Sequence, residues 1–203
     1  MVPSSHTKAK NAARSRRNRR ARPFALALLS GGLDSSACLH YFRARRYRVE
    51  ALFVDYGQPG SNYERHAAQN IARHYGTRLT VMRVAPMHVS QGVIPGRNAL
   101  LAVVALMSFP QPHGIVALGI HGGTSYSDCT SLFVSHVQAI YDLYASGSIR
   151  LDAPFIEWTK RDIYDYSKRH RLPICLTRSC ESGNRLPCGR CNSCRDIQAL
   201  HAG

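Results

Sequence analysis

Long hydrophobic segments are absent from this sequence. The longest apolar runs, FALALL at 24–29 and ALLAVVALM at 99–107, are too short to span a bilayer. The basic N-terminal stretch is followed by only six apolar residues and then by a glycine pair and an aspartate, which is not the pattern of a secretory signal. We therefore expect a soluble, cytoplasmic protein that makes no contact with a membrane.

Acidic residues are scarce, with 12 Asp and Glu against 27 Lys and Arg, so the net charge is +15. The excess is uneven, because residues 1–22 hold eight basic residues and no acid. These are Lys8, Lys10, Arg14, Arg16, Arg17, Arg19, Arg20 and Arg22. With almost no large apolar residue, this segment is predicted to be a disordered arm. A basic arm can hold nucleic acid through phosphate contacts, and it can equally be a solvated tail without a partner.

A disulfide framework is not expected either, because the seven cysteines occur in a chain without an export signal. Four of them are grouped near the C-terminus as Cys180-x7-Cys188-x2-Cys191-x2-Cys194. Four thiolates satisfy tetrahedral Zn²⁺, and the short spacings let each pair chelate around a tight turn. A closed shell of four sulfurs favours a structural zinc over a catalytic one, with an iron–sulfur cluster as the rival.

From residue 23 onward, short apolar runs alternate with amphipathic segments. The apolar runs predict strands at 24–29, 49–56, 78–84, 114–120 and 149–155. The amphipathic segments predict helices at 34–46, 61–75, 98–109, 128–145 and 159–170. Strands that alternate with helices indicate an α/β fold with a doubly wound parallel sheet. We divide the chain into the arm at 1–22, one folded domain at 23–173 and a zinc-binding C-terminal segment at 174–203.

Three of the helices carry more detailed expectations. In helix 61–75, Ser61 and Glu64 have the spacing of a capping box, and Gly76 is placed to end the helix in a left-handed conformation. Helix 98–109 is apolar on nearly all sides, which predicts that it is sandwiched between other elements. Helix 128–145 is amphipathic, with an expected inward face of Phe133, Val137, Ile140, Tyr141 and Tyr144.

The segment LLSGGLDSSACLH at 28–40 places two glycines where the first strand ends and the first helix begins. In an open parallel sheet, ligands bind at the carboxyl ends of the strands. Glycines permit positive φ and close approach of a ligand, and consecutive N–H groups at a helix N-terminus attract anions. The turn therefore predicts a phosphate site, although it is neither the dinucleotide fingerprint nor the usual triphosphate loop.

The pattern S-G-G-x-D-S after a first strand resembles the pyrophosphate loop of the PP-loop ATP pyrophosphatase superfamily. In that superfamily the loop grips the β,γ-pyrophosphate of ATP, and the adenylyl group passes to a substrate oxygen. The resemblance assigns ATP binding to Ser30, Gly31, Gly32, Leu33, Asp34 and Ser35. It also places Phe53, Val54 and Asp55, at the end of the second strand, against adenine.

Several further stretches are similar to the QueC family of 7-cyano-7-deazaguanine (preQ0) synthases. They are ALFVDYGQ, IPGRNALL, YSDCTSLF, APFIEWTKRDI and RSCESGNRLPCGRCNSCRD, in the order of the family. The resemblance implies that 7-carboxy-7-deazaguanine is adenylated with ATP and Mg²⁺, and that ammonia and a second ATP then give the nitrile. It also implies a homodimer and a domain at 23–173 that binds ATP.

The same resemblance suggests roles for residues outside the loop. Arg97 and Lys160, together with Asp34, are expected to act in catalysis, the two cations by neutralising charge on the phosphates. Tyr126 and Asp128 follow the fourth strand and are candidates for substrate binding, with a helix cap as the alternative role of Asp128. This chain departs from the family in a short loop before Pro95 and in HGGTSYSDC, which has no acid before Asp128. These departures bear on the acceptor substrate.

Three other functions are compatible with the motifs. A PP-loop enzyme that modifies tRNA would use the basic arm to hold the tRNA, but such enzymes usually need a cysteine pair near the ATP site. A degenerate PP-loop fold kept as a zinc-bearing interaction module is the alternative outside enzymes, and the intact S-G-G-x-D-S argues against it. A QueC-like enzyme that adenylates a different acceptor is the third possibility.

Overall fold

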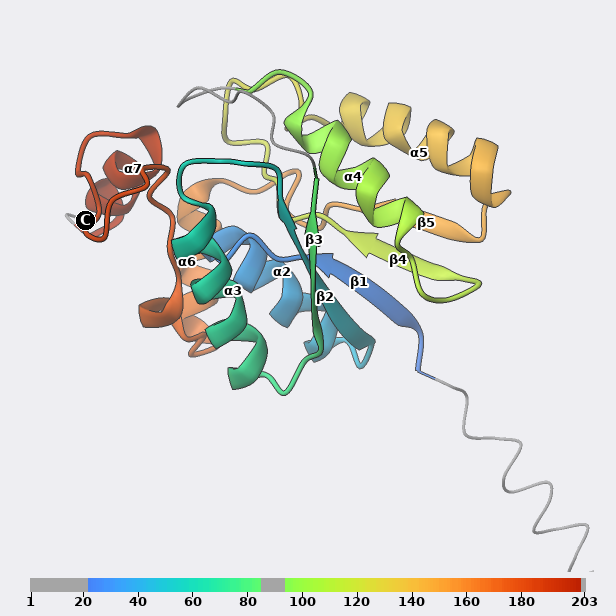
Figure 1. Cartoon of the computed structure of the whole chain (residues 1–203), viewed down its shortest axis with the longest axis horizontal. Helices are drawn as coiled ribbons and strands as arrows, with labels where there is room; N and C mark the ends of the chain where they lie inside the picture. The colour runs from blue at the N-terminus through green and yellow to red at the C-terminus, as the bar shows by residue number, and fades with distance from the viewer. Residues whose placement is uncertain (1–21, 85–93, 202–203) are drawn as a thin grey trace, which may run out of the picture.

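The computed structural model describes residues 22–84 and 94–201, so the basic arm lies almost entirely outside the described residues. A twisted parallel sheet runs through the centre, with helices on both faces (Figure 1). The strands are β1 (Phe24–Leu28), β2 (Arg48–Asp55), β3 (Leu79–Arg83), β4 (Gly114–Ala117) and β5 (Ile149–Asp152). Their order is β3-β2-β1-β4-β5, and every adjacent pair is parallel. The predicted α/β fold with a doubly wound sheet is confirmed.

The helices are α2 (Leu33–Ala44), α3 (Ser61–His74), α4 (Arg97–Met107), α5 (Ser131–Ala145), α6 (Lys160–Arg169) and α7 (Asn192–His201). Helices α2, α3 and α6 cover one face of the sheet, and α4 and α5 cover the other (Figure 1). Alternation along β1 supplies both cores, because Ala25 and Ala27 face the first group while Leu26 and Leu28 face the second. None of the helices in the described ranges is long and apolar enough to cross a membrane.

The expected capping box at the start of α3 is wrong. The cap residue is Gly60, and no side chain caps the helix. The carboxylate of Glu64 instead accepts a hydrogen bond from Gln58 Nε2 at 2.9 Å. The other end agrees with the sequence, because Gly76 follows α3 with a positive φ of 57°. The Glu64 carboxylate therefore binds the side chain of Gln58, in the loop before α3, and not the backbone N–H of Ser61 that the capping box required.

The expected burial of α4 and α5 is only partly correct. In α4, Ala102 and Ala105 are buried and the remaining residues are at least half-buried, except that Met107 at the end of the helix is 81% exposed. In α5, Val137 and Tyr141 face inward as predicted, whereas Ile140 and Tyr144 are 41% and 75% exposed. Phe133 is half-buried. The apolar stripe of α5 is therefore wider than the surface that the sheet can cover.

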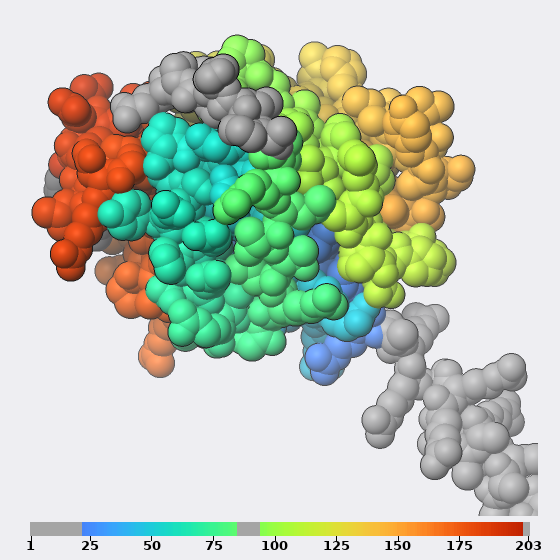
Figure 2. Space-filling view, in the orientation of Figure 1, coloured from blue at the N-terminus to red at the C-terminus, as the bar shows by residue number. Residues whose placement is uncertain are grey.

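The C-terminal segment folds back against the rest of the molecule. After the short 3-10 helix η1 (Ile174–Leu176), the Arg178 N–H donates to the Gly31 carbonyl at 2.8 Å. A Cβ on Gly183 would lie 2.7 Å from the Pro59 carbonyl oxygen, so this segment also packs closely on the loop before α3. Figure 2 shows the red C-terminal segment against the teal surface of residues near 60. The domain boundary at 173 stays a prediction.

Candidate active site and metal centre

The glycine turn joins β1 to α2 and is held by short local contacts. Ser35 Oγ donates to the Gly32 carbonyl at 3.0 Å and lies 3.1 Å from Ser30 Oγ. Gly31 has a φ of 87°, and a Cβ there would lie 2.5 Å from the Glu64 carbonyl oxygen. One glycine is thus required by packing against α3, while Gly32 lines the adjoining cavity.

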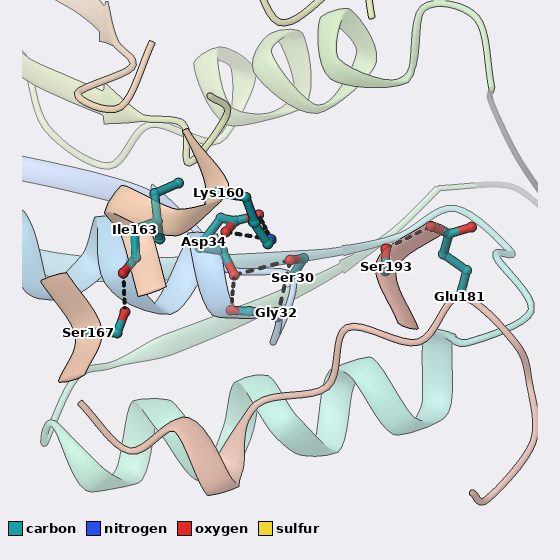
Figure 3. A network of polar contacts seen from close by, with 9 residues as sticks. Ser30, Gly32, Asp34, Lys160, Ile163, Ser167, Glu181 and Ser193 are labelled. Atoms are coloured by element: carbon teal, nitrogen blue, oxygen red, sulfur yellow. Dashed lines mark hydrogen bonds and ion pairs between the residues drawn. The ribbon is translucent and has the colours of Figure 1, made fainter. Parts of the chain in front are cut away.

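Asp34 and Lys160 meet at this turn, although 126 positions separate them in the chain (Figure 3). Lys160 Nζ donates to the two carboxylate oxygens of Asp34 at 2.6 and 2.7 Å. The side chains of Asp34 and Lys160 are 24% and 20% exposed, respectively. Lys160 is the first residue of α6, whose capping box between Thr159 and Asp162 fixes where the helix begins. The structure therefore places a cation and an anion together beside the predicted phosphate loop.

A cavity of about 340 Å³ lies at the carboxyl ends of the strands, where a ligand of an open parallel sheet binds. Most of the candidate residues line it. They are Ser30, Gly32, Leu33, Asp34, Ser35, Phe53, Val54, Arg97, Tyr126, Asp128 and Lys160. The fold thus brings the loop residues, the catalytic candidates and the substrate candidates to one cavity.

Asp55 and Gly31 are not among the residues that line the cavity. Asp55 pairs with Arg83 at 3.5 Å and accepts from the Gly57 N–H at 3.2 Å. Burial acts to raise the pKa of Asp55, but Ser61, the Gly57 N–H and Arg83 outweigh it and hold that pKa below its usual value. The Asp55 carboxylate therefore binds neighbouring groups at the edge of the sheet and does not line the cavity.

The residues after β4 are arranged around the start of α5. The cap of that helix is Thr130, whose hydroxyl accepts from the Phe133 N–H at 3.1 Å, so Asp128 does not serve as the cap. Asn98 Nδ2 donates to the Asp128 backbone carbonyl at 3.3 Å and fixes this loop on α4. The Asp128 carboxylate is left beside the Cys129 thiol at 3.9 Å and lines the cavity.

Several residues of the cavity wall were not expected from the sequence. The C-terminal segment contributes Arg178, Ser179, Glu181, Asn192, Ser193 and Asp196, and the body of the fold adds Gln58, Glu64 and His121. Asn192 Nδ2 donates to the Tyr126 hydroxyl at 3.2 Å, and Ser193 Oγ donates to Glu181 at 2.8 Å (Figure 3). The spacing of residues in the sequence could not predict that the C-terminal segment forms this wall, because that depends on how the segment folds back on the rest of the protein.

The four predicted metal ligands converge beside that wall. The sulfurs of Cys180, Cys188, Cys191 and Cys194 lie within 4.8 Å of one another. Gly189 turns the chain between them with a φ of 72°, as the spacing suggested.

Two of the four sulfurs are also prepared electrostatically to bind a cation, whereas burial raises the pKa of Cys194 to about 12. Backbone N–H groups donate to Cys180 Sγ at 3.2 Å and to Cys188 Sγ at 3.4 Å. Burial opposes ionisation of Cys180, but the Ser182 hydroxyl and the Cys188 N–H overcome it and lower its pKa to about 6. A closed set of four thiols, two of them stabilised as thiolates, fits a structural zinc ion.

Comparison with known proteins shows the family of this chain. The family model of the queuosine biosynthesis protein QueC matches residues 24–92 and 82–200. The chain belongs to the QueC family. The match includes the glycine turn, Arg97, Lys160 and all four cysteines of the cluster.

Curated members of the QueC family are similar along most of their length. The chain is 35% identical over 202 residues to a 7-cyano-7-deazaguanine synthase of Synechococcus sp. (strain RCC307), covering 84% of this chain and 90% of the relative. It is 31% identical to that of Rhizobium leguminosarum bv. trifolii (strain WSM2304), with 83% of each covered. For Prochlorococcus marinus (strain MIT 9515) the identity is 30%, over 87% of this chain and 92% of the relative.

Proposed function

We propose that this member of the QueC family makes 7-cyano-7-deazaguanine from 7-carboxy-7-deazaguanine, ammonia and ATP. The observation that carries the proposal is the convergence of the glycine turn, the Asp34–Lys160 pair and Arg97 on one cavity. A carboxylate is a poor electrophile until a good leaving group, here AMP, is attached to it. A site that combines a phosphate-binding turn with two cations supports that activation.

The parts of the cavity suggest where each component binds. The turn from Ser30 to Ser35 suits the pyrophosphate of ATP, and Phe53 and Val54 suit the adenine end. Mg²⁺ bound with ATP would neutralise charge on the departing pyrophosphate, and Asp34 offers carboxylate oxygens at that position. The four cysteines would hold Zn²⁺ and so keep the wall formed by the C-terminal segment in place.

The acceptor suits the part of the cavity that Arg97, Tyr126 and Asp128 line. The Asp128 carboxylate is available to accept hydrogen bonds from the N–H groups of a guanine-like edge. A site of this kind discriminates steeply, because an analogue without those groups leaves buried partners unpaired. The loop HGGTSYS at 121–127 contains no acid, so Asp128, which follows it, is the first carboxylate after β4.

ATP–pyrophosphate exchange tests the proposal directly. We expect exchange that depends on 7-carboxy-7-deazaguanine and is absent with 7-deazaguanine, which lacks the carboxylate. Addition of ammonia should then give AMP and the nitrile, detected by mass spectrometry. No exchange with the acid would reject the proposal.

A QueC-like enzyme with another acceptor is the second candidate, favoured by the altered loop at 121–127. AMP release with other amines or larger acids, without nitrile, would identify it. The tRNA-thiolating alternative is disfavoured, because Cys38 is fully buried in the core and burial strongly raises the pKa of its thiol.

We also propose that two copies associate through an apolar surface on α5 and α4. This surface consists of Leu132, Ile140, Leu143 and Tyr144 with Met107, which are 41–81% exposed. Leu143→Arg should turn a dimer into a monomer by light scattering. Leu186→Arg is the matched control, because Leu186 is equally exposed but lies in the cysteine segment. An unchanged mass in both variants would contradict this interface.

We propose that residues 1–22 contact nucleic acid and that exposed arginines of the folded domain extend this contact. Arg43, Arg46, Arg48, Arg73 and Arg78 are exposed near the amino ends of β2 and β3, and Glu50 is the acid that pairs with Arg48 and Arg78, at 3.9 Å each. The Arg48 N–H donates to the Pro23 carbonyl, so the described chain begins on this surface.

A salt series of tRNA binding tests both basic elements in the full-length chain. Charge reversal of Arg46 and Arg78 should lower the salt slope, whereas reversal of Arg150 and Arg185 should not. Neutralising Arg16, Arg17, Arg19 and Arg20 should lower it further. Equal slopes in all variants would reject the contact.

A further inference from the structure

The proposed reaction requires a group that accepts protons. When ammonia attacks the adenylated carboxyl carbon, AMP leaves and the nitrogen must lose a proton to become an amide. In the second stage the amide oxygen attacks the α-phosphate of ATP, pyrophosphate leaves, and one N–H proton is lost. Cleavage of the C–O bond then releases AMP while the second N–H proton leaves, which gives the C≡N bond. Each of these steps is faster with a positioned base.

Three of the carboxylates that line the cavity already have a close partner. Asp34 is bound by Lys160 through two hydrogen bonds, Glu64 accepts from Gln58, and Glu181 accepts from Ser193. His121 is different, because its Nδ1 is buried and has no hydrogen-bond partner within the described residues. The ring lines the cavity and is 8% exposed. A buried ring nitrogen without a partner is an uncommon and costly arrangement, which is typical of functional sites.

The fold holds His121 at the reactive edge of the sheet. It follows β4 and forms a parallel bridge with Phe155, which follows β5. A Cβ on Gly123 would lie 3.0 Å from Thr159 Cα and 3.4 Å from His121 Nδ1, so the ring stands close to the N-terminus of α6, where Lys160 begins the helix. The imidazole therefore shares one end of the cavity with the Asp34–Lys160 pair.

The surroundings keep the imidazole neutral, as a base must be. Burial is the largest influence and lowers the pKa of His121. The facing charged groups partly cancel, since Asp34 on α2 and Asp196 on α7 raise this pKa while Lys160 on α6 lowers it. Cys129 is the other titratable neighbour, and burial raises the pKa of its thiol, so it stays uncharged. A helix N-terminus also disfavours a protonated ring.

We propose that His121 is the general base that takes protons from the reacting nitrogen in the amidation and dehydration steps. This inference rests on the proposed function. It gives His121 no part in adenylation, because the carboxylate that attacks ATP carries no proton. The two halves of the reaction should therefore respond differently to its replacement.

The test compares His121→Gln with His136→Gln, since His136 is exposed on α5, away from the cavity. ATP–pyrophosphate exchange with 7-carboxy-7-deazaguanine should stay within about threefold of wild type in both variants. Nitrile formation with ammonia should fall about 10²- to 10⁴-fold in His121→Gln only. In the same variant, the acidic limb of the pH profile of kcat should disappear. Added imidazole should partly restore nitrile formation in His121→Ala.

Each other outcome is decisive. Equal losses of exchange and nitrile formation in His121→Gln would show that the residue only supports the cavity, and an unchanged rate would exclude it as the base. Either result would overturn the role of His121. Nitrile formation by the wild type would still support the proposed function. Absence of exchange in the wild type would reject both. Thermal unfolding of each variant confirms that it folds.

Discussion

Replacement of Gly31 by alanine tests whether the glycine turn depends on close packing against α3. Two costs follow from the structure. A side chain at a φ of 87° is strained by about 1–2 kcal/mol. In addition, the new Cβ would lie 2.5 Å from the Glu64 carbonyl and 2.9 Å from Ala67 Cβ, and such overpacking costs about 1–3 kcal/mol because the backbone must move. Together they predict a loss of about 2–5 kcal/mol in the free energy of unfolding.

Gly76→Ala is the matched control. Gly76 also has a positive φ, of 57°, but a Cβ there would meet no atom within 4 Å. It should therefore lose only the strain of about 1–2 kcal/mol. Replacing glycine by alanine lowers the conformational entropy of the unfolded chain by the same amount in both variants, so this contribution cancels in the comparison.

Urea unfolding followed by the fluorescence of Trp158, the single tryptophan of the chain, measures both values. Each kcal/mol should lower Tm by about 2–4 °C in a protein of this size. Gly31→Ala should also impair ATP–pyrophosphate exchange, because α3 and the loop are displaced, whereas Gly76→Ala should not. Equal destabilisation of the two variants would refute the argument from packing.

Three further predictions concern the cavity and the cysteines. Asp34→Ala and Ser35→Ala should each abolish AMP formation while the fold and the metal content stay unchanged, and retained AMP formation would contradict the role of the turn. The purified protein should contain about one zinc per chain, and a chelator should lower Tm, whereas iron with labile sulfide would contradict this. Burial raises the pKa of Glu64, against the opposing effects of Gln58, Arg97 and Arg178. The contribution of Glu64 to stability is therefore fully present below its pKa in the unfolded chain. It is lost as the pH rises through its pKa in the folded protein. Glu64→Gln should therefore raise the free energy of unfolding at pH 8 more than at pH 4, and a larger gain at pH 4 would refute the sign.

Features that depend on neighbours in the sequence were predictable. The apolar runs predicted the five strands to within a few residues. The signal is clearest for β1, which is buried on both faces and therefore needs continuous apolar residues. Gly76 ends α3 as expected, since only local backbone geometry is involved. The four cysteines converge because their short spacings allow chelation around tight turns. The α/β order of elements led directly to the parallel sheet.

Features that depend on which groups meet in space were decided by the tertiary structure alone. Glu64 binds the side chain of Gln58 and does not form the expected capping box. Ile140 and Tyr144 are exposed because the sheet beneath α5 is too narrow to cover its whole apolar stripe. The contact of Asp34 with Lys160 requires two helices 126 positions apart to begin at the same edge of the sheet. The tail closes the cavity because the Arg178 N–H reaches the Gly31 carbonyl, and no local pattern encodes that distance. Sequence periodicity specifies the face that an element buries, whereas packing determines the partner that each polar group finds.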